Sequence, residues 1–138
     1  MIQLWTAIIS YYDDSASAAA LRVALTGGLH NTESPQNVTF PYATFQLVSD
    51  VPDHWASADY FIENCLIQFN IFSKTRSMEQ LLTLYDLLKG VFDNIMSDDM
   101  GIDNYRLIQM VRQNLIVPGR LEGVWQANVT YRLWLEPS

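Results

Sequence analysis

The sequence has a single cysteine, Cys65, among its 138 residues, and this scarcity limits what can hold the fold together. One cysteine cannot form an intrachain disulfide, so we expect a protein made in a reducing compartment and stabilised by its core. No apolar run approaches the roughly 20 residues that a membrane-spanning helix needs. Met1 is not followed by the basic segment of a secretory leader. We therefore expect no membrane partner.

Charge, and positive charge above all, is also scarce. The chain has 8 Lys and Arg residues and 15 Asp and Glu residues, which gives a formal net charge of −7. Charged residues make up 17% of the chain. This balance argues against a general nucleic-acid binder, because such proteins neutralise phosphates with clustered Lys and Arg. An acidic surface is still suited to a channel through which DNA slides without sticking. Few charges also favour an oligomer with covered surfaces, with compositional scatter as the alternative.

The length predicts one domain over residues 1–138, large enough for a hydrophobic core. Apolar spacing indicates three helices, of which the second ends at Gly27-Gly28 and the third begins with a capping box at Ser77 and Gln80. Alternation indicates strands, with a turn at Pro118-Gly119. The expected helices are Ile2–Tyr12, Ala16–Thr26 and Ser77–Ile95. The expected strands are Tyr42–Ser49, Phe61–Ser73, Tyr105–Ile116 and Gly123–Leu135, with loops at Leu29–Val38 and Asp50–Tyr60.

These elements predict an α+β fold of order α-α-β-β-α-β-β. An antiparallel sheet of about four main strands carries the long helix across its apolar face, next to the N-terminal helices. The strand expected over Tyr105–Ile116 has apolar residues at both odd and even positions and so on both of its faces. This pattern indicates a bulge or a strand that is covered on both sides.

Two of the expected strands alternate apolar residues with uncharged polar ones. In Phe61–Ser73, Cys65, Ile67 and Phe69 take the inward face. The outward faces carry amides and large apolar groups where a solvated sheet would more commonly carry charges, so we expect either contact with a second subunit or cover by the N-terminal helices. The candidate subunit-interface residues are Gln68, Asn70, Phe72, Gln126, Asn128, Thr130, Arg132 and Trp134.

Catalytic candidates are weak. Cys65 and His54 could form a thiol nucleophile with its base, but Cys65 shares its face with core residues, where cysteine behaves as a small hydrophobe. His30 is the one other histidine, which gives a histidine-based zinc site little support. We therefore predict no catalytic site.

Acidic clusters have a simpler interpretation as turns. Asp98-Asp99 with Asp103 and Asn104 could offer oxygen ligands to calcium, but the EF-hand spacing is absent and the segment follows a helix. Asp50 and Asp53 could act as an acid–base pair, but they stand in a stretch rich in turn-forming residues. We expect no cofactor and no metal.

The layout resembles the tail-terminator or tail-completion proteins of long-tailed bacteriophages, which are small head–tail joining proteins. The likeness rests on a short helical N-terminus, on Phe40-Pro41-Tyr42 opening a strand that ends in Val48-Ser49-Asp50, and on Glu63–Ser73 with the long helix that follows. It extends over most of the chain. The chain departs from the family in a longer N-terminal stretch and in the loop Asn31–Thr39.

The resemblance implies a ring of identical copies, usually six, that caps the tail tube and stops its polymerisation. Such a ring joins the tube protein to the head connector, and DNA passes through its lumen. The chain would then reside in the tail or neck of a virion, after assembly in the host cytoplasm. The alternatives are another phage neck, head-completion or minor structural protein, a non-phage oligomeric adaptor, and a small cytoplasmic enzyme or ligand-binding domain.

Overall fold

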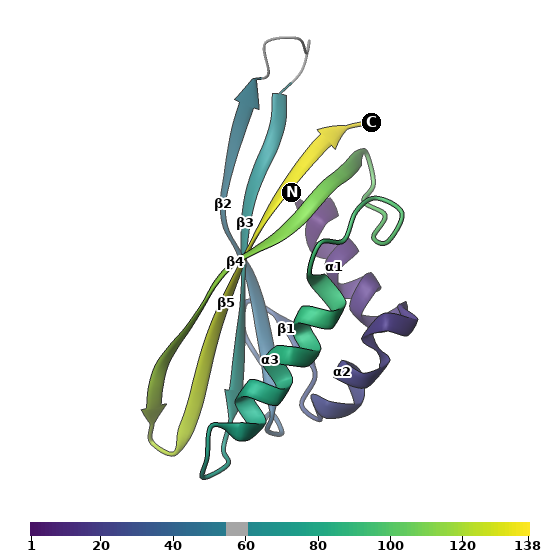
Figure 1. Ribbon diagram of the computed structural model, residues 1–138. Coiled ribbons are helices and arrows are strands. Elements are labelled where there is room, and N and C mark those ends of the chain that lie inside the picture. Colours follow the sequence, from purple (N-terminus) through teal and green to yellow (C-terminus); the bar gives the residue numbers. More distant parts are fainter. Residues whose placement is uncertain (55–60) are drawn as a thin grey trace.

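The computed structural model describes residues 1–54 and 61–138, and within them three α-helices lie against one five-stranded sheet (Figure 1). The helices are α1 (Ile2–Asp14), α2 (Ala19–Ala24) and α3 (Glu79–Phe92), with a 3₁₀ turn at Ala16–Ala18. The strands are β1 (Leu29–Asn31), β2 (Tyr42–His54), β3 (Phe61–Ser73), β4 (Tyr105–Leu121) and β5 (Val124–Pro137). The predicted α+β class is confirmed.

The strand order is β1-β2-β3-β5-β4, and the pairs β2–β3, β3–β5 and β5–β4 are antiparallel. β1 pairs in parallel with β2, so the sheet is mixed and the expectation of a wholly antiparallel sheet needs correction. Leu29–Asn31 was expected to be loop. Three residues are too few to show an alternating pattern, which is why the sequence did not reveal this strand.

All three helices lie on one face of the sheet (Figure 1). Leu4 and Ile8 of α1 and Leu88 of α3 belong to the same buried cluster as Ile67 and Phe69 of β3. The predicted inward faces of β3 and β5 are confirmed, because every second residue is buried from Cys65 to Ser73 and from Ala127 to Leu135. The core is therefore a single layer between helices and sheet, and no helix in residues 1–54 or 61–138 lies over the other face of the sheet.

The ends of α3 differ from expectation. Gln80 does not close a capping box, since its side-chain oxygen accepts a hydrogen bond from Ser73 Oγ at 2.5 Å. The helix also ends at Phe92 and not at Ile95. Asn94 adopts a positive φ of 58°, and its N–H donates to the carbonyl of Met110 at 2.9 Å, which turns the chain toward β4.

β4 contains the irregularity that its apolar pattern predicted. Its register with β5 shifts at three places. The turn expected at Pro118-Gly119 is wrong, because β4 continues to Leu121 and the chain reverses at Glu122 and Gly123, whose φ angles are 52° and 81°. Two positive φ angles suit a tight hairpin. Pro118 is tolerated because β4 is an edge strand, where a missing N–H breaks no ladder.

β2 is also longer than expected. It continues through Pro52 to His54, although Asp50–Tyr60 was expected to be a loop. A register shift between Leu47 and Ser49 marks a bulge, and it obscures the alternation along β2. Residues 55–60 of that expected loop lie outside the described residues.

Candidate functional site

The sheet face opposite the helices is the most distinctive surface of the molecule. We call it the open face, and it extends over β2, β3, β5 and β4 from the row of Tyr42, Phe72 and Gln126 to the row of Val51, Asn64 and Trp134. The N-terminal helices pack on the other side of the sheet, so they do not cover it. All eight candidate interface residues lie on it.

Antiparallel register brings these candidates together as direct neighbours. On the other side of β3, Thr44 and Gln46 of β2 lie opposite Asn70 and Gln68, so these two rows of polar side chains continue onto a third strand. The register pairs across β3 and β5 are Gln68 with Thr130, Asn70 with Asn128, Phe72 with Gln126, Leu66 with Arg132, and Asn64 with Trp134.

Hydrogen bonds between side chains run across the centre of the open face. They join Gln46 Nε2 to Gln68 Oε1 at 3.3 Å, Asn70 Nδ2 to Thr44 Oγ1 at 3.3 Å, and Gln126 Nε2 to Asn128 Oδ1 at 2.8 Å. Each amide offers two N–H groups and an oxygen with two lone pairs, so these bonds leave donors and acceptors that can bind a partner. The centre of the open face is therefore polar and able to form further hydrogen bonds, although it carries little charge.

Arg132 is the one charged described residue between the rows that bound the open face, and Asp53 and Glu136 lie just beyond the row of Asn64 and Trp134. Its guanidinium donates to Asn64 Oδ1 at 2.6 Å, and Asn64 Nδ2 donates to Asp53 Oδ2 at 3.1 Å. This relay links the cation to a carboxylate at the upper edge of the sheet. Burying such a face costs less than burying free charges, since desolvating an unpaired ion is far more expensive than desolvating an amide.

Asp50 and Asp53, considered above as an acid–base pair, lie on opposite faces of β2. Asp50 lies opposite Cys65 in the register, on the helix side, whereas Asp53 accepts from Asn64. Asp50 instead shares a hydrogen bond with Glu63, and this bond, with burial and the charge of Asp50, raises the pKa of Glu63 to about 7. Sequence reasoning missed the pair because the bulge in β2 hides which residues of the two strands are neighbours.

The Asp50–Glu63 pair predicts a pH effect on stability. The pKa of Glu63 lies above its unfolded value, so the stabilisation is complete at pH values below the ordinary 4.5 and is lost as pH rises through about 7. We expect Glu63→Gln, which keeps a hydrogen-bond donor, to unfold at higher urea than the wild type at pH 8 and to show a flatter pH profile. Urea midpoints between pH 5 and pH 8 measure this, and parallel profiles for the two proteins would contradict it.

The structure does not bring Cys65 and His54 together. They stand opposite Asp50 and Phe61 respectively, four positions apart along the β2–β3 register, or about 13 Å. Burial, followed by the nearby carboxylate of Asp50, raises the pKa of the Cys65 thiol to about 12, so at neutral pH it is protonated. His54 packs its ring edge-on against Phe61, with centroids 5.2 Å apart.

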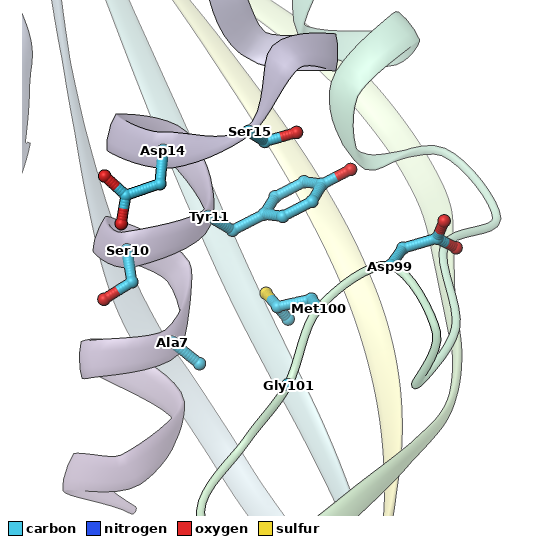
Figure 2. A pocket seen from close by; sticks show the side chains of 8 residues that line it. All are labelled: Ala7, Ser10, Tyr11, Asp14, Ser15, Asp99, Met100 and Gly101. Carbon is cyan, nitrogen blue, oxygen red and sulfur yellow. The ribbon is translucent and has the colours of Figure 1, made fainter.

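The acidic segment after α3 forms a turn. Asp99 Oδ2 accepts from the N–H of Met96 at 2.9 Å, which uses the carboxylate locally. A shallow hollow of about 300 Å³ separates this turn from α1 (Figure 2). Asp14 and Asp99 lie on opposite sides of it, and Tyr11 Oη donates to the carbonyl of Val91 at 3.2 Å. In residues 1–54 and 61–138, no three His, Cys, Asp or Glu side chains cluster as metal ligands.

A polar network beneath α3 also escaped the sequence analysis. Tyr131 Oη donates to Asp93 Oδ1 at 2.6 Å, and the guanidinium of Arg112 lies 3.2 Å from Asp93 Oδ2 and donates to Tyr85 Oη. Burial, together with the hydrogen bond to Asp93, raises the pKa of Tyr131. The network connects the helix α3 and its C-terminal end with β4 and β5. Its members come from three different elements, so the periodicity of no single element reveals it.

Comparison with known proteins places the fold. No protein-family model and no curated protein sequence matches the chain. Among solved structures, a chain from the virion of a native gene transfer agent particle superposes with a TM-score of 0.75. The two share a fold. They are 8% identical, and the match covers 95% of this chain and 92% of that one.

A second solved chain matches with a TM-score of 0.54 at 14% identity, over 99% of this chain and 95% of that one. Such low identities carry fold information and no more. Among the described helices, none is long and apolar enough to cross a membrane.

Proposed function

We propose that this protein is a structural component of a phage-like virion, and more narrowly a tail terminator. In this role identical copies close into a ring, six in the usual form, that caps the tail tube and joins it to the head connector. The observation that carries the proposal is the open face, which is continuous over four strands, is covered by none of the described helices and is almost free of charge. The fold likeness to a virion chain supports it.

A ring requires one surface of each copy to contact a different surface of the next, repeated with a rotation that closes. The open face suits the first of these surfaces because its amides can exchange hydrogen bonds with a partner at a low desolvation cost. The net charge of −7 suits a lumen along which DNA slides, since like charges repel. On this proposal the protein acts by contact and catalyses no reaction.

Size-exclusion chromatography with light scattering, followed by negative-stain imaging, tests the ring. We expect an oligomer of uniform mass and closed annular particles. Addition of purified tail tubes tests the terminator role, because ring particles should then appear at one tube end and tube growth should stop. A monomer that stays monomeric at high concentration and in the presence of tubes would contradict the proposal.

A double substitution tests whether the open face is the contact. Asn128→Glu with Thr130→Glu places two carboxylates at the centre of the face, beside Asn70 and Gln68. We expect subunit affinity to fall tenfold or more, since each buried unpaired charge costs about 1–3 kcal/mol even when partly solvated. The inward residues are unchanged, so the fold should persist, and light scattering and circular dichroism measure the two effects.

The matched control adds the same charge elsewhere. Val23→Glu with Leu82→Glu places two carboxylates on exposed positions of α2 and α3. We expect this variant to assemble like the wild type. If the open-face variant and the control retain the same oligomer, the open face is not the subunit contact.

A further inference from the structure

The open face carries one positive charge that its neighbours do not neutralise. Arg132 lies opposite Leu66 of β3 and Val111 of β4, which are both apolar. Its guanidinium donates to Asn64 Oδ1 at 2.6 Å, and within residues 1–54 and 61–138 it forms no ion pair. That bond leaves further N–H donors of the guanidinium for a partner. Burying a cation without a carboxylate is costly, so a surface that covers the open face has to supply one.

The two carboxylates just beyond the open face are already bound. Asp53 accepts from Asn64 at 3.1 Å, so a neutral amide separates it from Arg132. Glu136 lies 3.0 Å from the guanidinium Nε of Arg106. The charge of Arg132 is therefore left for a partner to match. A second copy can do so, because the chain has 15 acidic residues and 8 basic ones.

Carboxylates without a cation gather on the helix side, at the hollow between α1 and the turn after α3. Asp14 and Asp99 lie on opposite sides of this hollow (Figure 2). No Lys or Arg occurs in residues 1–21 or 90–105. In the part of the chain that the structure describes, no aspartate of α1 or of residues 98–103 forms an ion pair. The exposed aspartates of these two segments are Asp13, Asp14, Asp98, Asp99 and Asp103.

The C-terminal end of α1 gives a second, independent reason to expect a cation there. A helix carries partial negative charge at its C-terminus, where positive side chains are favoured. α1 instead ends in Asp13 and Asp14 and has no basic residue in its last turn. Arg22 of α2 donates to the carbonyls of Tyr12 and Ser15 at 2.6 and 2.7 Å, which satisfies backbone groups and neither carboxylate. A cation from another molecule would relieve this repulsion.

The hollow suits an arginine side chain. Its volume is about 300 Å³, equal to about ten water molecules at roughly 30 Å³ each. Ala7 and Met100 line it with apolar surface, against which the methylene groups of an arginine can pack. The carboxylates of Asp14 and Asp99 on its two sides can accept from the guanidinium, in charge-assisted hydrogen bonds that are stronger than neutral ones.

We propose that Arg132 on the open face of one copy binds between Asp14 and Asp99 of the next copy. The inference rests on the self-assembly proposed above, and it identifies the second of the two surfaces that a ring requires. Arg132 is on the open face and the hollow is on the helix side, so the contact joins two different surfaces and repeats from copy to copy. Charge complementarity selects this occupant.

Charge reversal on each side tests the contact. Arg132→Glu should weaken assembly tenfold or more, and Asp14→Lys should weaken it to a similar degree. The double variant should recover most of the affinity, because the reversed pair attracts in the same place. Light scattering over a concentration series measures this at about 0.15 M salt, where exposed charges more than about 8 Å apart are largely screened.

Asp14→Lys also separates a role in the contact from a role in the fold. A positive charge favours the C-terminus of α1, so the urea midpoint of this variant should be no lower than that of the wild type while its assembly weakens. Asp13→Lys is the matched control, because it makes the same charge change in the same turn but does not line the hollow. We expect it to change the affinity by less than about threefold.

The outcomes separate this contact from the ring. Wild-type assembly by Arg132→Glu would overturn the contact and leave the ring. The contact would equally be overturned if the double variant recovered no affinity, or if Asp13→Lys weakened assembly as much as Asp14→Lys. Recovery with open chains in negative stain would support the contact and contradict the ring. A wild type that stays monomeric, with and without tail tubes, would overturn both.

Discussion

Leu88→Asp is expected to abolish the folded state. Leu88 is 1% exposed on α3, within the cluster that joins the helices to β3 and β5. The aspartate would lose the packing of the leucine, about 2–5 kcal/mol for truncation of a buried leucine, and would bury a carboxylate without a partner. A domain of this size has a total stability of about 5–15 kcal/mol, so the two costs together consume most or all of it.

Far-UV circular dichroism and urea unfolding measure this effect. Leu82→Asp is the matched control, because Leu82 lies on the same helix but is 40% exposed. We expect the control to lose no more than about 1 kcal/mol, as exposed substitutions usually do. A native spectrum and a cooperative melt for Leu88→Asp would show that the helix does not pack on the sheet through this side.

Gly27→Ala is expected to have the second largest effect. A Cβ on Gly27 would lie 1.7 Å from the carbonyl oxygen of Thr39 and 2.7 Å from Cβ of Tyr42. The backbone cannot move aside easily, since the N–H of Gly27 donates to the carbonyl of Pro41 at 2.9 Å and Thr26 Oγ1 donates to the carbonyl of Phe40 at 3.0 Å. We expect a loss of about 3 kcal/mol or more, at or beyond the upper end of ordinary overpacking.

Gly90→Ala is its matched control, because a Cβ there would meet no atom within 4 Å. Gly90 lies inside α3, where alanine is favoured over glycine by up to about 1 kcal/mol, so this variant should be more stable than the wild type. Urea midpoints of the two variants should therefore shift in opposite directions. Equal midpoints for Gly27→Ala and the wild type would mean that the chain after α2 does not pass against the start of β2.

Much of the fold could be predicted because β3 and β5 are regular. Every second residue from Cys65 to Ile71 and from Trp125 to Leu135 is apolar, so both strands and their inward faces follow from a period of two. The candidate interface residues shared a face for the same reason. The second helix was predicted over Ala16–Thr26 with Gly27-Gly28 as its C-cap, but α2 ends at Ala24 and Leu25 is its C-cap. Gly28, with a φ of 82°, lies in the turn that follows, and the tight contact that requires Gly27 is tertiary and has no local signal.

Other features depend on contacts between distant segments. The Asp50–Glu63 hydrogen bond follows from a cross-strand register that a bulge has shifted. The bond from Tyr131 to Asp93 joins residues 38 positions apart. Periodicity describes one element at a time, so it identifies which side chains face inward but not which polar groups meet there.

The strand order has a consequence for how the chain folds. β2–β3 and β4–β5 are each neighbours in sequence, so both hairpins form from local contacts at a small loss of chain entropy. Joining β3 to β5 is different, because it brings together residues such as Asn64 and Arg132, which are 68 positions apart. That pairing also completes the surface on which α3 packs. We therefore expect the docking of the two hairpins to limit the folding rate, and substitutions at β3–β5 contacts to slow folding more than substitutions within either hairpin.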